Sequence, residues 1–243
     1  DDIRIRSNDK VPNPNKTFLE YLNEMPAYRN KVMAFGGWDV FPFIINETRS
    51  GIPVNSGFIP AEGTTLSETE KLLNRLQEEI RGPWESVRLD PFTHHYALEA
   101  IRSQKPSILY LAYGETDDWA HDGKYDEYLK SAKQTDTYLK ELWETIQSDP
   151  YYQNKTTMLI TVDHGRGTTK TSWKSHGADV PGAGQVWLLA IGPDTPPLGE
   201  IKEEGQWYSA MLPRTIFGLL GLDYPEKKAA SEWKEILGQT NSK

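Results

Sequence analysis

Three of the five histidines in this 243-residue chain stand next to aspartate or glycine in short segments that could bind a metal ion. Asp117 and His121 are four residues apart, so on one turn of helix both side chains can point at the same ion. Asp163 and His164 are adjacent, and both can bind only where a strand has given way to a turn, because neighbours on a regular strand face opposite ways. His176 precedes a glycine in the following loop. The candidate metal ligands are therefore Asp117, His121, Asp163, His164 and His176.

The types of these residues also limit the metal. Mixed carboxylate and imidazole ligands suit Zn²⁺, Mn²⁺ or Fe better than Ca²⁺ or Mg²⁺, which favour all-oxygen shells. The chain has no cysteine, which excludes thiolate-bound zinc, iron–sulfur clusters, disulfides and a thiol nucleophile. His94 and His95 follow Pro91 and Thr93 near an expected helix start, and we interpret them as capping or surface residues.

The positions of the candidate ligands fit the elements that the sequence predicts. Apolar, β-rich runs at 107–112 and 157–162 lead directly into the segments that contain Asp117 and Asp163. In open α/β sheets, ligands bind beyond the carboxyl ends of the strands, so we expect the candidate ligands to converge at that edge. Further strands are expected at 31–35 and 185–191, and helices at 17–29, 38–45, 67–82, 94–104, 125–147 and 207–220.

The alternation of apolar strands and amphipathic helices predicts an α/β fold, with a mainly parallel sheet sandwiched between helices. The clearest local signal is Ser67-Glu68-Thr69-Glu70, a capping box ahead of a helical apolar spacing. Residues 1–16 are polar and rich in Pro and Asn, so we expect a loop or extended arm. There is no internal repeat and no linker, and we expect residues 1–243 to form a single domain.

Composition restricts the class of partner. The 27 basic and 35 acidic residues give a net charge of −8, which argues against a nucleic-acid partner or an anionic membrane surface. No apolar run approaches the roughly 18 residues of a membrane span. The apolar and charged fractions, 37% and 26%, are those of an ordinary globular protein.

The combination of Asp117-x-x-x-His121, Asp163-His164-Gly165 and His176-Gly177 resembles the metal-binding set of the alkaline phosphatase superfamily. That superfamily includes alkaline phosphatases, nucleotide pyrophosphatase/phosphodiesterases, cofactor-independent phosphoglycerate mutases and sulfatases. The resemblance extends over roughly residues 17–224 and implies an alkaline-phosphatase-like metallohydrolase domain. It also implies two divalent ions, usually zinc, about 3.5–4 Å apart. By position, Asp117, His121 and His176 would hold one ion, and Asp163 and His164 the other.

The resemblance implies a metal-dependent phosphomonoesterase or phosphodiesterase that acts on a small phosphate ester. A mutase-like phosphotransferase, a sulfatase acting on sulfate esters and a non-catalytic metal-binding remnant remain alternatives. In the family, a strand ending in Asp and a Ser or Thr nucleophile come before the region that aligns with Thr17. We therefore expect this chain to lack that N-terminal segment and its nucleophile, and to be inactive alone. The catalytic residue is thus unassigned, and no organic-cofactor site is expected.

The resemblance favours a periplasmic or secreted location, and we expect the N-terminus that would carry a signal peptide to be missing from this chain. The sequence does not specify the oligomeric state, the substrate or the metal.

Overall fold

The computed structural model describes residues 5–202 and 205–238. The chain divides into two units, Asp1–Thr145 and Ile146–Lys243. The prediction of a single domain stays a prediction.

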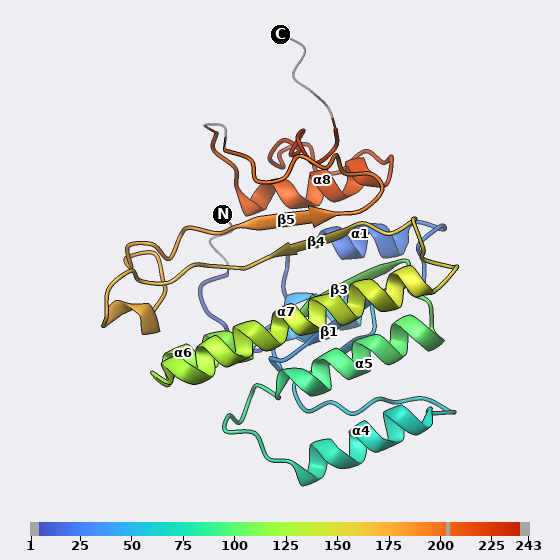
Figure 1. Ribbon diagram of the computed structural model, residues 1–243. Coiled ribbons are helices and arrows are strands. Elements are labelled where there is room, and N and C mark those ends of the chain that lie inside the picture. Colours follow the sequence, from blue (N-terminus) through green and yellow to red (C-terminus); the bar gives the residue numbers. More distant parts are fainter. Residues whose placement is uncertain (1–4, 203–204, 239–243) are drawn as a thin grey trace. The chain divides into compact units, whose positions relative to one another are not determined.

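The first unit is built on a three-stranded parallel sheet with the order β2-β1-β3 (Figure 1). Its strands are β1 (Val32–Gly36), β2 (Val54–Ser56) and β3 (Ile108–Ala112). In the central strand, Ala34 is paired with Val54 on one side and with Tyr110 on the other. The parallel sheet with its helices confirms the predicted α/β fold class.

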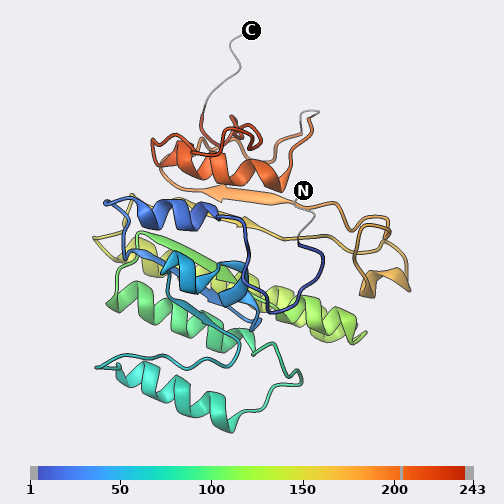
Figure 2. The same cartoon turned by 180° about the vertical axis from the view of Figure 1, so that it is seen from behind.

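Seven helices accompany this sheet in the described part of the unit. They are α1 (Phe18–Glu24), α2 (Phe41–Ile44), α3 (Glu47–Ser50), α4 (Glu68–Glu79), α5 (Asp90–Ser103), α6 (Glu115–His121) and α7 (Tyr125–Ser148), whose last residues enter the second unit. Helix α5 packs against all three strands, α4 packs against α5, and α1 contacts β1 (Figure 2). Strand β2 and helix α3 were not predicted, because each is shorter than the window over which hydrophobic periodicity can be recognised.

Apolar side chains of β1, α4 and α5 form a buried cluster between these elements. Its buried members are Phe35, Leu73, Phe92, Tyr96, Ala97 and Ala100. Helix α4 begins where the sequence predicts: the Ser67 hydroxyl accepts the Glu70 N–H, and the Glu70 carboxylate accepts the Ser67 N–H. This reciprocal pair satisfies two of the N–H groups that a helix start leaves unbonded.

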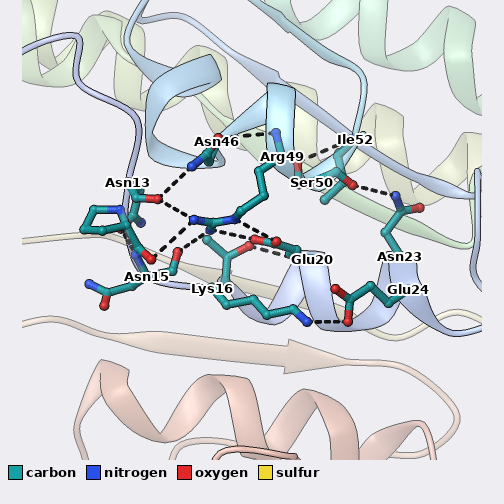
Figure 3. A network of polar contacts seen from close by, with 12 residues as sticks. Asn13, Asn15, Lys16, Glu20, Asn23, Glu24, Asn46, Arg49, Ser50 and Ile52 are labelled. Carbon is teal, nitrogen blue, oxygen red and sulfur yellow. Dashed lines mark hydrogen bonds and ion pairs between the residues drawn. The ribbon is translucent and has the colours of Figure 1, made fainter.

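A polar network in the first unit centres on Arg49 of α3 (Figure 3). Its Nε and Nη2 atoms donate to the Glu20 carboxylate over 2.9 and 2.8 Å. The remaining N–H groups donate to the carbonyls of Asn13, Pro14 and Asn15. Residues 5–16 have no helix or strand, as predicted for this arm, and Arg49 fixes its end to α1 and α3.

The second unit contains an antiparallel pair of strands, β4 (Met158–Thr161) and β5 (Leu188–Ile191). Met158 is paired with Ile191, and Thr161 with Leu188. The sequence predicted these strands but placed them in a mainly parallel sheet. Parallel neighbours need a crossover, usually a helix. The connection between β4 and β5 contains only a short 3₁₀ turn, η1 (Ser172–Lys174), and returns the chain in the opposite direction.

The rest of the second unit follows β5. The short 3₁₀ turn η2 (Ser209–Met211) leads into helix α8 (Leu212–Leu219), which is shorter than predicted. Among the described residues, no helix has the length and apolar character needed to cross a membrane.

Candidate metal-binding residues

Asp117 and His121 lie on α6, the short helix that follows strand β3. Their spacing of four residues brings His121 Nε2 to 3.3 Å from Asp117 Oδ2. Both side chains are about half exposed, at 40% for Asp117 and 46% for His121. A carboxylate and an imidazole therefore stand side by side on one accessible face of α6, as the spacing predicts.

The start of α6 is held by Asp90, the first residue of α5. Asp90 Oδ1 accepts the Gly114 N–H at 2.8 Å, and Oδ2 accepts the Glu115 N–H at 3.2 Å. In the opposite direction, Glu115 Oε1 accepts the Asp90 N–H at 2.8 Å. Each helix thus begins against the carboxylate of the other, and the first turn of α6, which carries Asp117, is fixed to α5.

Sequence analysis did not identify Asp90 as part of this arrangement. Asp directly before Pro91 is a typical helix-start pair, and this signal predicts a capping role without naming the helix that is capped. Asp90 in fact binds N–H groups 24 and 25 residues further along the chain. Only the pairing of β3 with β1 brings them together.

Burial changes the acidity of carboxyl groups around this helix start. Burial, assisted by the charge of Glu115, raises the pKa of Asp90 from 3.8 to about 7. Burial likewise raises the pKa of Asp118 to about 6. A positive ion near these groups would favour their ionised forms, because an opposite charge opposes the effect of desolvation.

His94 is a core residue, and its interpretation as a capping or surface residue was wrong. Its side chain is fully buried, with Nδ1 2.8 Å from the Tyr113 hydroxyl and Nε2 3.1 Å from Glu141 Oε2. The ring stacks on Tyr138 at 4.0 Å. The helix starts at Asp90, earlier than predicted, so His94 falls on the face that packs inward. His95 is exposed, as predicted.

Asp163 and His164 follow β4 at the point where the strand has ended. The Asp163 carboxylate accepts the His164 N–H at 3.0 Å, and its other oxygen is 3.6 Å from His164 Nε2. His164 Nδ1 lies 2.9 Å from the Gly165 carbonyl. Because a carbonyl can only accept, Nδ1 carries the proton of the neutral ring and Nε2 carries the lone pair. This is the tautomer that a metal ligand requires.

His176 comes from the loop between β4 and β5, and its ring stacks on that of His164. The ring centroids are 3.7 Å apart and the planes differ by 15°. Gly165 makes this close loop arrangement possible: its N–H donates to the Ala183 carbonyl, and an added Cβ would collide with the carbonyl oxygens of Gln185 and Gly182. The loop therefore returns tightly to the end of β4.

The five predicted ligands thus form two groups, one in each unit. Asp117 and His121 are adjacent in the first unit, and Asp163, His164 and His176 are adjacent in the second. Carboxylate and imidazole donors of this kind are the ligand class that Zn²⁺ and similar divalent ions use.

The comparison with protein families agrees with this class. Residues 92–182 match the model of the Metalloenzyme superfamily. All five candidate ligands lie within the matched residues. No curated protein and no solved structure matches the chain. This match suggests binding of divalent metal and metal-dependent chemistry of the phosphoesterase or mutase kind.

Proposed function

We propose that this protein is a metal-dependent hydrolase of phosphate esters, with Asp117, His121, Asp163, His164 and His176 as its metal ligands. The observation that carries the proposal is the geometry of His164. Its Nδ1–H donates a hydrogen bond to the Gly165 carbonyl. Nε2 therefore carries the lone pair, beside Asp163 and His176. A purely structural histidine has no need of two further potential ligands in contact with it.

The residues fit a divalent ion by their chemistry. The set offers two carboxylates and three imidazoles, which is the ligand class of Zn²⁺, Mn²⁺ and Fe. The sequence resemblance divides these ligands between two ions, with Asp117, His121 and His176 at one and Asp163 and His164 at the other.

In such a site, bound divalent ions polarise the phosphoryl group and stabilise the charge that develops on the attacking and leaving oxygens. The chain's own part is to hold the ligands in place. Asp90 and Glu115 fix the first turn of α6, and the Gly165 carbonyl orients the His164 ring. Such outer contacts typically contribute about 10- to 100-fold to metal affinity or activity.

Metal content is the first test. The purified chain is dialysed against zinc and then against metal-free buffer, and bound zinc is measured by elemental analysis. We expect retained zinc in the unmodified chain and a loss in both His176→Ala and Asp117→Asn. His95→Ala is the matched control, because His95 is an exposed histidine outside the set, and it should retain zinc. Zinc content that is unchanged in both ligand variants would refute the assignment.

Activity is the second test, made with the purified protein. We expect zinc-dependent release of p-nitrophenol from p-nitrophenyl phosphate or from its bis ester, abolished by Asp163→Asn. Faster turnover of one of the two esters would identify a monoesterase or a diesterase. Transfer of phosphate within a phosphosugar or phosphoglycerate without net hydrolysis would instead support a mutase-like reaction. Retention of zinc without any turnover would leave a metal-binding module and refute the hydrolase.

A further inference from the structure

A small cavity lies in the first unit between the turn after β2 and the end of α4. It is lined by Phe58, Gln77, Ile80, Arg81, Gly82 and Trp84, and its volume is about 250 Å³. A cavity of roughly 150 Å³ is enough for one benzene ring. The available space therefore suits one ring with its substituents and is small for a nucleotide or another drug-sized molecule, which occupies about 300–1,000 Å³.

The walls of the cavity are apolar and partly aromatic. Phe58 and Ile80 are left 39% and 44% exposed, so both offer apolar surface to a ligand in the cavity. Trp84 is half-buried and its position is fixed by two contacts: its ring packs edge-on against Trp119, with the centroids 4.7 Å apart, and its Nε1 donates to Asp122 at 3.1 Å. A rigid indole and a phenyl ring offer stacking surfaces for a planar ring.

One wall residue presents an unused hydrogen-bond acceptor. Gln77 is only 8% exposed, and its Nε2 donates to the Phe58 carbonyl at 2.9 Å, which fixes the orientation of the amide. Its Oε1 is buried and accepts no hydrogen bond from any described residue. A buried acceptor without a partner is costly, so a ligand that brings an O–H or N–H group to this oxygen would gain from satisfying it.

Arg81 gives the cavity a positive charge. Its side chain is exposed, and among the residues that the structure describes it has no hydrogen-bonding or ion-pair partner. The carboxylate of the neighbouring Glu79 pairs instead with Arg75, whose Nε lies 3.8 Å from Glu79 Oε1. A guanidinium of this kind is suited to a carboxylate, which it can bind through two parallel N–H groups.

From these four features we propose that the cavity is a binding site for a single-ring aromatic acid that carries a hydroxyl or N–H donor. The ring lies against Trp84 and Phe58, the donor faces Gln77 Oε1, and the carboxylate pairs with Arg81. The site is separate from the proposed metal ligands and needs no metal. It adjoins α6 through the contact between Trp84 and Trp119.

Binding of 4-hydroxybenzoate to the chain in EDTA-containing buffer tests the proposal, measured by calorimetry and by the shift of the Trp84 indole N–H resonance. We expect a Kd of about 1 mM or tighter, as befits a ligand of this size. Benzoate, which lacks the donor, and phenol, which lacks the charge, should each bind more weakly. Because EDTA removes metal ions, the binding result does not depend on the outcome of the zinc and hydrolysis experiments.

Two variants on the same surface complete the test. Arg81→Gln should weaken 4-hydroxybenzoate binding by about three- to tenfold, as expected for an exposed charge-assisted hydrogen bond. Arg75→Gln is the matched control on α4 and should bind as the unmodified chain does. No binding, equal binding by the Arg81 and Arg75 variants, or equal affinity for phenol would each overturn the proposal.

Discussion

Replacing Asp90 by Asn tests whether this carboxyl group is neutral in the folded protein at pH 5. Burial raises its pKa from 3.8 to about 7, so between these values the folded protein holds a proton that the unfolded chain has released. The free energy of unfolding must therefore fall as pH rises through this window. The full effect amounts to about 4 kcal/mol, and about 3 kcal/mol of it falls between pH 5 and pH 8. Asp90 is only 3% exposed, so solvent screening does not reduce this figure appreciably.

The experiment is urea unfolding of both proteins at pH 5 and pH 8, followed by circular dichroism. Asn cannot titrate, so the stability of Asp90→Asn relative to the unmodified chain should improve by about 3 kcal/mol from pH 5 to pH 8. The lost hydrogen bond to one of the two backbone N–H groups lowers the variant's stability at both pH values and cancels from this comparison. Asp118, whose pKa is also raised, titrates in both proteins and cancels as well. An unchanged difference between the two pH values would show that Asp90 is ionised throughout.

Three further substitutions have outcomes that the same unfolding assay can measure at pH 7. Ser67→Ala removes the capping side chain of α4 and should cost about 1 kcal/mol; no loss would mean that the box does not stabilise the helix. Gly57→Ala should cost at least about 2 kcal/mol, because φ is +53° and the new Cβ would meet the Asp39 side chain. His94→Phe keeps a ring in the core but leaves the Tyr113 hydroxyl without its imidazole partner, at a cost of about 1–3 kcal/mol. Stability equal to that of the unmodified chain would contradict the last two arguments.

The fold class was predictable because its signals are local and repeated. Strand β3 and helix α7 begin and end within one residue of the predicted bounds. The strand is a continuous apolar run, and the helix has a long apolar stripe with a period of 3.6 residues. The antiparallel pairing of β4 with β5 was not predictable in this way. Strand direction depends on the path of the connecting loop, and that loop contains polar residues and glycines without a periodic pattern.

The candidate ligands were found from residue type and spacing, but the groups that orient them were not. Asp117 and His121 are close in the sequence, and their contact follows from helix geometry alone. Asp90 reaches α6 only because β1 and β3 are neighbours, and His94 meets Glu141 across 47 residues. A buried histidine on an inward helix face also has the same sequence signature as an exposed one. Long-range partners of this kind need the three-dimensional structure.

The guanidinium of Arg49 has five N–H groups, and the five hydrogen bonds described above account for all of them. Lysine, with three donors on one atom, could not replace it, and Glu20, whose side chain is only 5% exposed, would then keep a charge without adequate compensation. Because one side chain makes all five hydrogen bonds, displacing the Arg49 guanidinium breaks them together. The 13–15 segment, α1 and α3 therefore have one common opening event, and amide hydrogens in these three stretches should exchange with solvent at a shared rate rather than fraying in order from the terminus.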